Sequence, residues 1–153
     1  MSEERLRAYD LAPATIDVVR KVEAHIQQCG LEKSLIHLVK MRASQINGCA
    51  FCLDMHSREA RQHGETEQRL YLLSGWRESP LYSARERAAL AWTEAVTLIA
   101  EIHAPDAEYE TLRKHFSEVE VVNLTVLIRL INLWNRLCVS LRTPHAVAKA
   151  KAA

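Results

Sequence analysis

Residues 42–56 read RASQINGCAFCLDMH, and the fold is decided around this stretch. Apolar residues recur at helical spacing over residues 32–46, so this segment is expected to be a helix. The pair Asn47-Gly48 ends it, because both residues tolerate the left-handed conformation found at helix ends. A second helix is expected to follow at once over residues 49–63 and to end at Gly64. The stretch therefore predicts two helices that meet at a tight corner.

The rest of the chain repeats the helical period with few interruptions. Only 4 Gly and 4 Pro occur in 153 residues, which favours long helices over many short strands. Ser83 with Glu86 and Ser117 with Glu120 are capping-box patterns that mark two helix starts. We predict one all-α domain over residues 1–153, a helical bundle of about six to seven helices. The expected helices cover residues 13–30, 32–46, 49–63, 65–73, 83–99, 105–116 and 117–142.

The composition is that of an ordinary globular protein, with 48% hydrophobic residues, 25% charged residues and a formal net charge of +1. This balance argues against nucleic acid or a membrane surface as a partner. The first ten residues are charged and lack the apolar segment of a secretion signal. We therefore expect a cytoplasmic protein whose four cysteines are reduced by default.

The segment 119–141 is the most apolar part of the chain. Asparagine and arginine side chains interrupt it, which argues against a membrane span. A helix that is apolar on most of its circumference must be buried on several sides, and one small domain rarely supplies that cover. We therefore expect a homo-oligomer with this helix near the interface, although the central helix of a monomeric bundle would show the same pattern.

Cys49, Cys52 and His56 carry the clearest chemical signal. On a helix they fall within an arc of roughly 60°, so all three side chains share one face. Two thiols three residues apart at a helix start can form a disulfide. A histidine one turn beyond and the unpaired amides of the helix N-terminus both lower a thiol pKa. The thiolate is the form that attacks a peroxide or a disulfide, so we interpret the set as a redox site.

Other interpretations of these residues remain open. Two buried structural cysteines beside a core histidine would give the same sequence pattern. Zinc also binds Cys and His, but structural zinc commonly takes four ligands from two separated pairs, and no second pair is visible. The remaining cysteines, Cys29 and Cys138, are interpreted as buried structural residues.

The stretch 42–56 closely resembles the AhpD-like alkylhydroperoxidase family, within the carboxymuconolactone decarboxylase superfamily. The similarity extends through GETEQRL at 64–70, ERAALAWTEA at 86–95 and NLWNR at 132–136, and so covers most of the chain. It implies an all-α fold that assembles into trimers or hexamers.

The resemblance also implies a thiol peroxidase that reduces hydrogen peroxide or alkyl hydroperoxides without metal, haem or flavin. Cys52 would attack the peroxide and become a sulfenic acid, and Cys49 would resolve it to a disulfide. His56 would belong to the proton relay. An external dithiol, carried by a lipoyl-bearing or thioredoxin-like protein, would reopen the disulfide.

One position departs from the family pattern. The relay of the family often includes a glutamate twelve residues before the first cysteine, and this position holds His37. Histidine also shuttles protons near neutral pH, so His37 is a candidate relay residue. Glu94, in an otherwise apolar stretch, is a second candidate, with a salt-bridged glutamate as the alternative interpretation.

Two further functions are compatible with the chain. One is a lactone decarboxylase in the manner of the other branch of the superfamily, which does not need the cysteine pair. The other is a redox-sensing or disulfide-exchange module in which the disulfide switches the assembly state.

Overall fold

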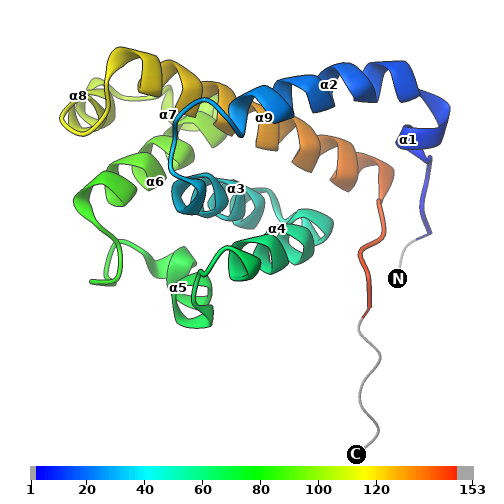
Figure 1. The fold of residues 1–153 in the computed structure, drawn as a ribbon, viewed down its shortest axis with the longest axis horizontal. Coiled ribbons are helices and arrows are strands. Elements are labelled where there is room, and N and C mark those ends of the chain that lie inside the picture. The colour runs from blue at the N-terminus through cyan, green and yellow to red at the C-terminus, as the bar shows by residue number, and fades with distance from the viewer. Residues whose placement is uncertain (1–2, 148–153) are drawn as a thin grey trace, which may run out of the picture.

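The structure is a computed structural model that describes residues 3–147, and within them it contains nine α-helices, one 3-10 turn and no strand. The prediction of an all-α fold is confirmed. The elements are α1 (Ala8–Leu11), α2 (Pro13–Ile26), α3 (Lys33–Asn47), α4 (Ala50–Gln62), α5 (Glu67–Leu72), η1 (Leu73–Gly75), α6 (Ala84–Thr97), α7 (Ile99–Ile102), α8 (Asp106–Arg113) and α9 (Glu118–Leu141) (Figure 1).

All seven expected helices are present, and α1 and α7 are additional. Each of these two has four residues, too few to show a periodic pattern in a sequence. The expected domain reaches beyond the described residues at both ends, at 1–2 and 148–153. Both capping boxes form as predicted, at Ser83 and Ser117, and they begin α6 and α9.

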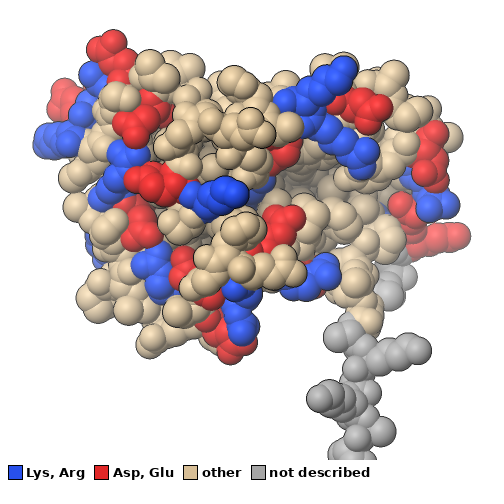
Figure 2. Space-filling model, in the orientation of Figure 1, with Lys and Arg blue, Asp and Glu red and all other residues tan. Residues whose placement is uncertain are grey.

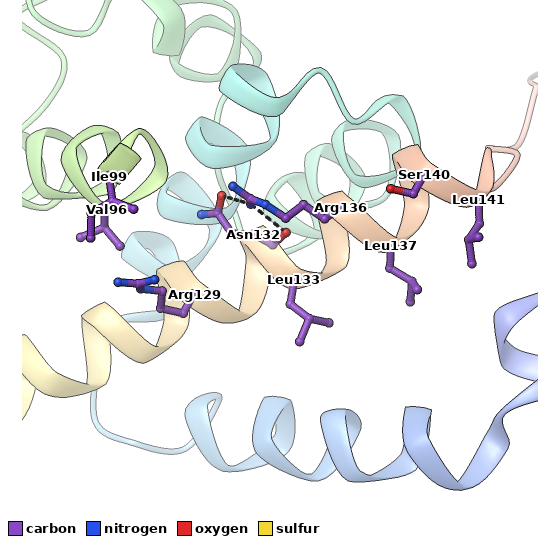
Figure 3. Close-up of a pocket in the computed structure, with 9 residues that line it drawn as sticks. All are labelled: Val96, Ile99, Arg129, Asn132, Leu133, Arg136, Leu137, Ser140 and Leu141. Carbon is purple, nitrogen blue, oxygen red and sulfur yellow. Dashed lines mark hydrogen bonds between the residues drawn. The ribbon is translucent and has the colours of Figure 1, made fainter. Parts of the chain in front are cut away.

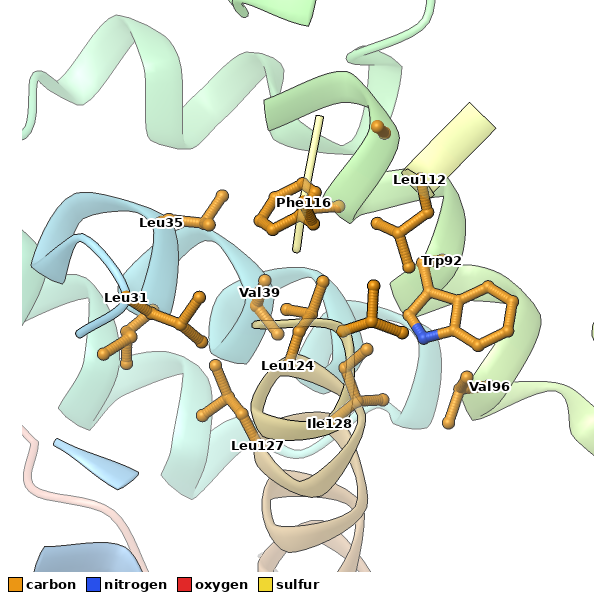
Figure 4. Packing of buried hydrophobic residues seen from close by; sticks show 14 of the residues in the cluster. Leu31, Leu35, Val39, Trp92, Val96, Leu112, Phe116, Leu124, Leu127 and Ile128 are labelled. Carbon is orange, nitrogen blue, oxygen red and sulfur yellow. The ribbon is translucent and has the colours of Figure 1, made fainter. Parts of the chain in front are cut away.

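The long helix α9 runs through the bundle and packs against α3, α6 and α2. Its inward residues join Leu35 and Val39 of α3 and Trp92 of α6 in the larger hydrophobic cluster (Figure 4). By length and composition alone α9 could cross a membrane, with a mean hydropathy of 1.4. In this fold, however, it has the position of a core helix. The inward residues of α9 in the cluster are Val121, Leu124, Leu127 and Ile128.

A second hydrophobic cluster lies on the other side of α3. Leu38 and Met41 of α3 pack there with Leu73 and Trp76, which follow α5. The surface that faces the viewer in Figure 2 carries acidic and basic side chains interspersed over the helices. The two clusters fix α3 from both sides, and α3 in turn fixes the corner that leads into α4.

Gly48 makes that corner. Its φ of +63° is the left-handed conformation that closes α3, and the chain re-enters a helix two residues later. Asn47 ties the corner to α9, because its side-chain amide donates to the Oδ1 atoms of Asn132 at 3.0 Å and Asn135 at 2.9 Å. Asn135 donates in turn to Ser44 Oγ at 3.0 Å. This polar network fixes α9 against the end of α3, just before the corner that leads into α4.

Candidate active site

Cys49 is the N-cap of α4. Its backbone is extended, and its Sγ accepts a hydrogen bond from the backbone N–H of Cys52 at 3.3 Å. A side chain in this position normally satisfies one of the unpaired amides at a helix start. The corner at Gly48 therefore places a sulfur atom where a helix favours negative charge.

A third thiol completes a cluster with this pair. The Sγ atoms of Cys49, Cys52 and Cys138 lie within 4.8 Å of one another, and all three residues are buried. Cys138 comes from α9, so the packing of α9 on α4 creates the cluster. Phe51 packs against the three sulfurs.

The three thiols have unequal tendencies to ionise. Hydrogen bonds from the thiols of Cys138 and Cys52 hold the pKa of Cys49 well below its usual range. The hydrogen bond with Cys138, the one with Cys49, and burial raise the pKa of Cys52. The hydrogen bond to Cys49 likewise raises the pKa of Cys138. Within the cluster, the helix start and these hydrogen bonds therefore favour the thiolate on Cys49 over the other two cysteines.

A pocket of about 320 Å³ opens beside Cys52. His56, one turn along α4, lines the same pocket, and its Nδ1 lies 2.8 Å from Oε2 of Glu59. This hydrogen bond lowers the pKa of Glu59, so the carboxylate stays charged and orients the imidazole. The other lining residues include Tyr9, Arg20, Gln27, Met55, Trp134 and Cys138.

A buried ion pair forms another part of the pocket wall. Lys40 of α3, which is 3% exposed, is paired with Glu23 of α2. Burial by itself would raise the pKa of Glu23, but the adjacent Lys40 ammonium outweighs it and the pKa is lowered. The pocket beside Cys52 therefore contains two carboxylates, each held by a basic side chain.

His37 lies in a different environment from the one expected of a pocket residue. Its Nε2 is 3.2 Å from Nδ1 of His63, which also lies 2.8 Å from the backbone carbonyl oxygen of Glu59. Burial, followed by the charge of His63, lowers the pKa of His37 to about 4. Its Nδ1 is buried and makes no hydrogen bond to any described residue. His37 is thus a neutral imidazole behind the pocket, connected to Glu59 through His63.

Glu94 belongs to a separate cluster on α6. It accepts hydrogen bonds from Arg42 Nε at 2.8 Å, Trp76 Nε1 at 2.8 Å and Arg77 at 2.7 Å. It is not among the residues that line the pocket beside Cys52. The structure thus shows the salt-bridged glutamate that was the alternative interpretation of this residue.

The comparisons with known proteins agree with this geometry. The model of the carboxymuconolactone decarboxylase family matches residues 13–95, more than half of the chain. The chain belongs to the carboxymuconolactone decarboxylase family. The predicted resemblance to AhpD-like proteins is thereby confirmed.

Two relatives cover most of this chain, and a third matches a shorter part of it. The uncharacterized protein YdfG of Bacillus subtilis (strain 168) is 41% identical over 138 residues, which are 90% of this chain and 94% of YdfG. The crystal structure of ATU0492 from Agrobacterium tumefaciens, a protein of unknown function, is 50% identical. It superposes with a TM-score of 0.93 over 95% of this chain and 100% of its own. Alkyl hydroperoxide reductase AhpD of Hyphomonas neptunium is 44% identical over 41 residues, 27% of this chain and 23% of its own.

Within the family fold, the structure brings together three of the five predicted site residues: Cys49, Cys52 and His56. Sequence reasoning missed other residues of the site, because they come from different helices. Glu59 had a usable signal, since it lies three residues after His56 on the same helix. The residues without a local signal are Tyr9, Glu23, Lys40 and Cys138.

The thiol cluster also has the chemistry of a soft-metal site. Three cysteine sulfurs are ligands that zinc accepts. Cys138 of α9 supplies the third sulfur, beside the two from the Cys49 and Cys52 pair. No histidine or carboxylate among the described residues joins the three sulfurs within the same separation, so a fourth ligand would have to come from elsewhere.

Proposed function

We propose that this protein is a thiol-dependent peroxidase that reduces hydrogen peroxide or alkyl hydroperoxides through Cys49 and Cys52. One observation carries the proposal: Cys52 borders a pocket that also holds His56, and it lies beside a cysteine whose sulfur the helix start favours as a thiolate. Family membership supports the same class of enzyme.

The proposed reaction uses the cluster in two steps. His56, one turn along α4 in the same pocket, takes the proton of Cys52, and the Cys52 thiolate attacks the peroxide. The O–O bond breaks, the sulfur becomes a sulfenic acid, and the alcohol or water leaves with a proton. Cys49 then attacks the sulfenic sulfur, hydroxide leaves and takes up a proton as water, and the Cys49–Cys52 disulfide forms.

His56 is the proposed donor of the proton that the leaving oxygen needs. Its partner Glu59 holds the ring in place through the hydrogen bond at Nδ1. His37 would influence the relay only indirectly, because its partner His63 contacts the backbone carbonyl oxygen of Glu59 and not the carboxylate that holds His56. We do not assign Glu94 a direct part, since Arg42, Trp76 and Arg77 occupy its oxygens.

The experiment that tests the proposal is rapid mixing of the reduced protein with about one equivalent of hydrogen peroxide, followed by mass mapping of the cysteines. We expect Cys49 and Cys52 to be lost together as an intramolecular disulfide, far faster than free cysteine reacts. Cys52→Ser should abolish the fast phase, and Cys29→Ser, at a thiol outside the cluster, should leave it unchanged. Slow, unselective oxidation of all thiols would contradict the proposal.

Turnover requires an external reductant. We propose a dithiol carried by a lipoyl-bearing or thioredoxin-like protein, because a dithiol reopens a disulfide without a cofactor. The cycle also needs free thiols, which a reducing compartment maintains, so we place the protein in the cytoplasm.

We also propose that the protein is a homo-trimer or homo-hexamer. An apolar stripe remains exposed on α9 at three-, four- and seven-residue spacing: Val119, Val122, Val126 and Leu133. Beside it, a pocket runs along α9, and Val96 and Ile99 close one end of it (Figure 3). Light scattering of the protein and of Val122→Lys tests this: we expect an oligomer that the lysine dissociates, and a monomeric parent protein would contradict it.

A further inference from the structure

Cys138 differs from an ordinary buried cysteine in its surroundings. It belongs to neither of the two hydrophobic clusters that form the core. Its neighbours are the other two sulfurs and Phe51. The sulfur of Cys138 therefore lies among other sulfurs and not among the aliphatic side chains of the core.

Two pockets meet at this residue. The first, described above, is lined by Cys52 and Cys138 but not by Cys49. The second, of about 350 Å³, is lined by Cys49 and Cys138 but not by Cys52. Part of its wall is formed by the residues that follow α9 in the sequence, Arg142, Thr143, Pro144 and His145. Cys138 is the one cysteine that borders both pockets.

We propose that Cys138 is a third redox thiol, which accepts the disulfide from Cys49 and Cys52 and presents it to a small dithiol bound in the second pocket. The inference rests on the proposed peroxidase function for the origin of the disulfide and for the donor class. It adds a separate place for the donor, in the pocket that Cys52 does not line.

The exchange step balances without an added reactant. The Cys138 thiolate attacks the Cys52 sulfur of the Cys49–Cys52 disulfide, that S–S bond breaks, and a Cys52–Cys138 bond forms. Cys49 leaves as the thiolate that the helix start and its hydrogen-bond donors stabilise. The proton of Cys138 moves to a neighbouring base, and no electrons are gained or lost.

The donor then reduces the transferred disulfide. One donor sulfur attacks Cys138 from the second pocket, and Cys52 leaves as a thiolate that faces the peroxide pocket again. The second donor thiol attacks the mixed disulfide, closes the donor disulfide and releases Cys138. The donor loses two electrons and two protons, and these restore two protein thiols. A pocket of this volume suits a narrow dithiol arm.

The geometry allows the transfer with side-chain movement alone. The three sulfurs begin within 4.8 Å of one another, and a disulfide needs about 2.05 Å. The Asn47 hydrogen bonds to Asn132 and Asn135 hold the end of α3, from which the chain turns into α4, against α9, and this keeps the exchange partners close.

Trypsin provides a direct test. Cys49 and Cys52 fall in one peptide, residues 43–58, so their disulfide creates no link between peptides. Cys138 falls in peptide 137–142. We expect a covalent link between these two peptides when the reduced protein is oxidised, quenched with acid, alkylated and digested. Oxidation with diamide forms the disulfide without peroxide, so the outcome is independent of the peroxidase proposal.

A kinetic test follows the reduction of the oxidised protein by dihydrolipoamide in a single turnover. Cys138→Ala should still form the Cys49–Cys52 disulfide but be reduced roughly tenfold more slowly than the parent, because only direct attack on Cys49, which also lines the second pocket, then remains. Cys29→Ala is the matched control and should be reduced at the parental rate. Absence of the linked peptides together with parental reduction of Cys138→Ala would overturn the inference.

The two proposals can fail separately. If peroxide oxidises Cys49 and Cys52 slowly but diamide produces the linked peptides, the peroxidase proposal fails and the proposed redox role of Cys138 is supported. If peroxide oxidises the pair rapidly but neither peroxide nor diamide produces the linked peptides, the proposed role of Cys138 fails and the peroxidase proposal stands. The peptide link is measured on the unmodified chain, so poor folding of a variant does not affect it.

Discussion

The buried ion pair beside the peroxide pocket makes a quantitative prediction about Lys40→Met. Methionine preserves the length and the apolar stem of Lys40 but removes the charge that faces Glu23. Removing one partner of a buried pair costs about 3–5 kcal/mol, because the other charge is left unpaired. Glu23 retains 22% side-chain exposure and borders the pocket, so water recovers part of this cost. We therefore expect a loss of about 2–3 kcal/mol in the free energy of unfolding.

Thermal unfolding at pH 7 measures this loss, with an expected fall in Tm of about 5–10 °C for a chain of this size. The double variant Glu23→Gln/Lys40→Met is the matched control and should recover at least half of the loss, because it leaves no unpaired charge. The pKa of Glu23 is lowered in the folded state, so the stability from the pair is present above pH 4.5 and is lost as the pH falls through the folded pKa. The difference between Lys40→Met and the parent should therefore shrink below pH 4.5. Equal losses in the single and double variants would refute this account of the pocket wall.

Three further predictions follow from other parts of the site. Glu59→Gln should lower the rate of peroxide reduction roughly tenfold and shift its pH profile, because His56 loses the carboxylate that orients it. Unchanged kinetics in a rapid-mixing experiment would exclude this role of Glu59. The pKa of His37 falls from 6.5 to about 4 on folding, so the unfolded chain binds more protons between these values and stability decreases as the pH falls from 6.5 towards 4. His37→Gln should remove about 2–3 kcal/mol of this pH dependence, seen as a flatter Tm profile than that of the parent. Gly48→Ala should destabilise the protein by about 1 kcal/mol in urea unfolding, from its φ of +63° alone, because no atom lies within 4 Å of the added Cβ.

The helices were predictable because their signals are local. The capping boxes at Ser83 and Ser117 and the break at Gly48 each depend on residues within four positions of one another, and each appears in the structure. The early end of α2 at Ile26, four residues before Gly30, shows the limit of this reasoning. The turn at Gln27 and Gln28 has no strong helix breaker, so only the packing of the chain onto α9 decides it.

The active site was predictable only where it lies on one helix. Cys49, Cys52 and His56 share a face of α4, and the helical period places them together before any tertiary contact is known. Cys138 is separated from Cys49 by 89 positions and reaches it through the packing of α9 on α4. The pairing of Lys40 with Glu23 has the same origin, since it connects α3 to α2. Such contacts depend on how the helices pack against one another, and the spacing of residues within a single helix does not predict that packing.

The distribution of charge in the thiol cluster also resolves a conflict over which cysteine reacts. The start of α4 favours a thiolate on Cys49, whereas the family pattern assigns the attack to Cys52. Nucleophilicity of a thiolate increases with its pKa, so charge placed on Cys52 reacts faster with peroxide than the same charge on Cys49. Only Cys52 of these two borders the pocket with His56. In the proposed mechanism Cys49 therefore resolves the sulfenic acid formed on Cys52, and it leaves readily as a thiolate when its disulfide is exchanged. A low pKa at Cys49 and attack by Cys52 are thus two parts of one mechanism, and Cys138 extends it to the donor side.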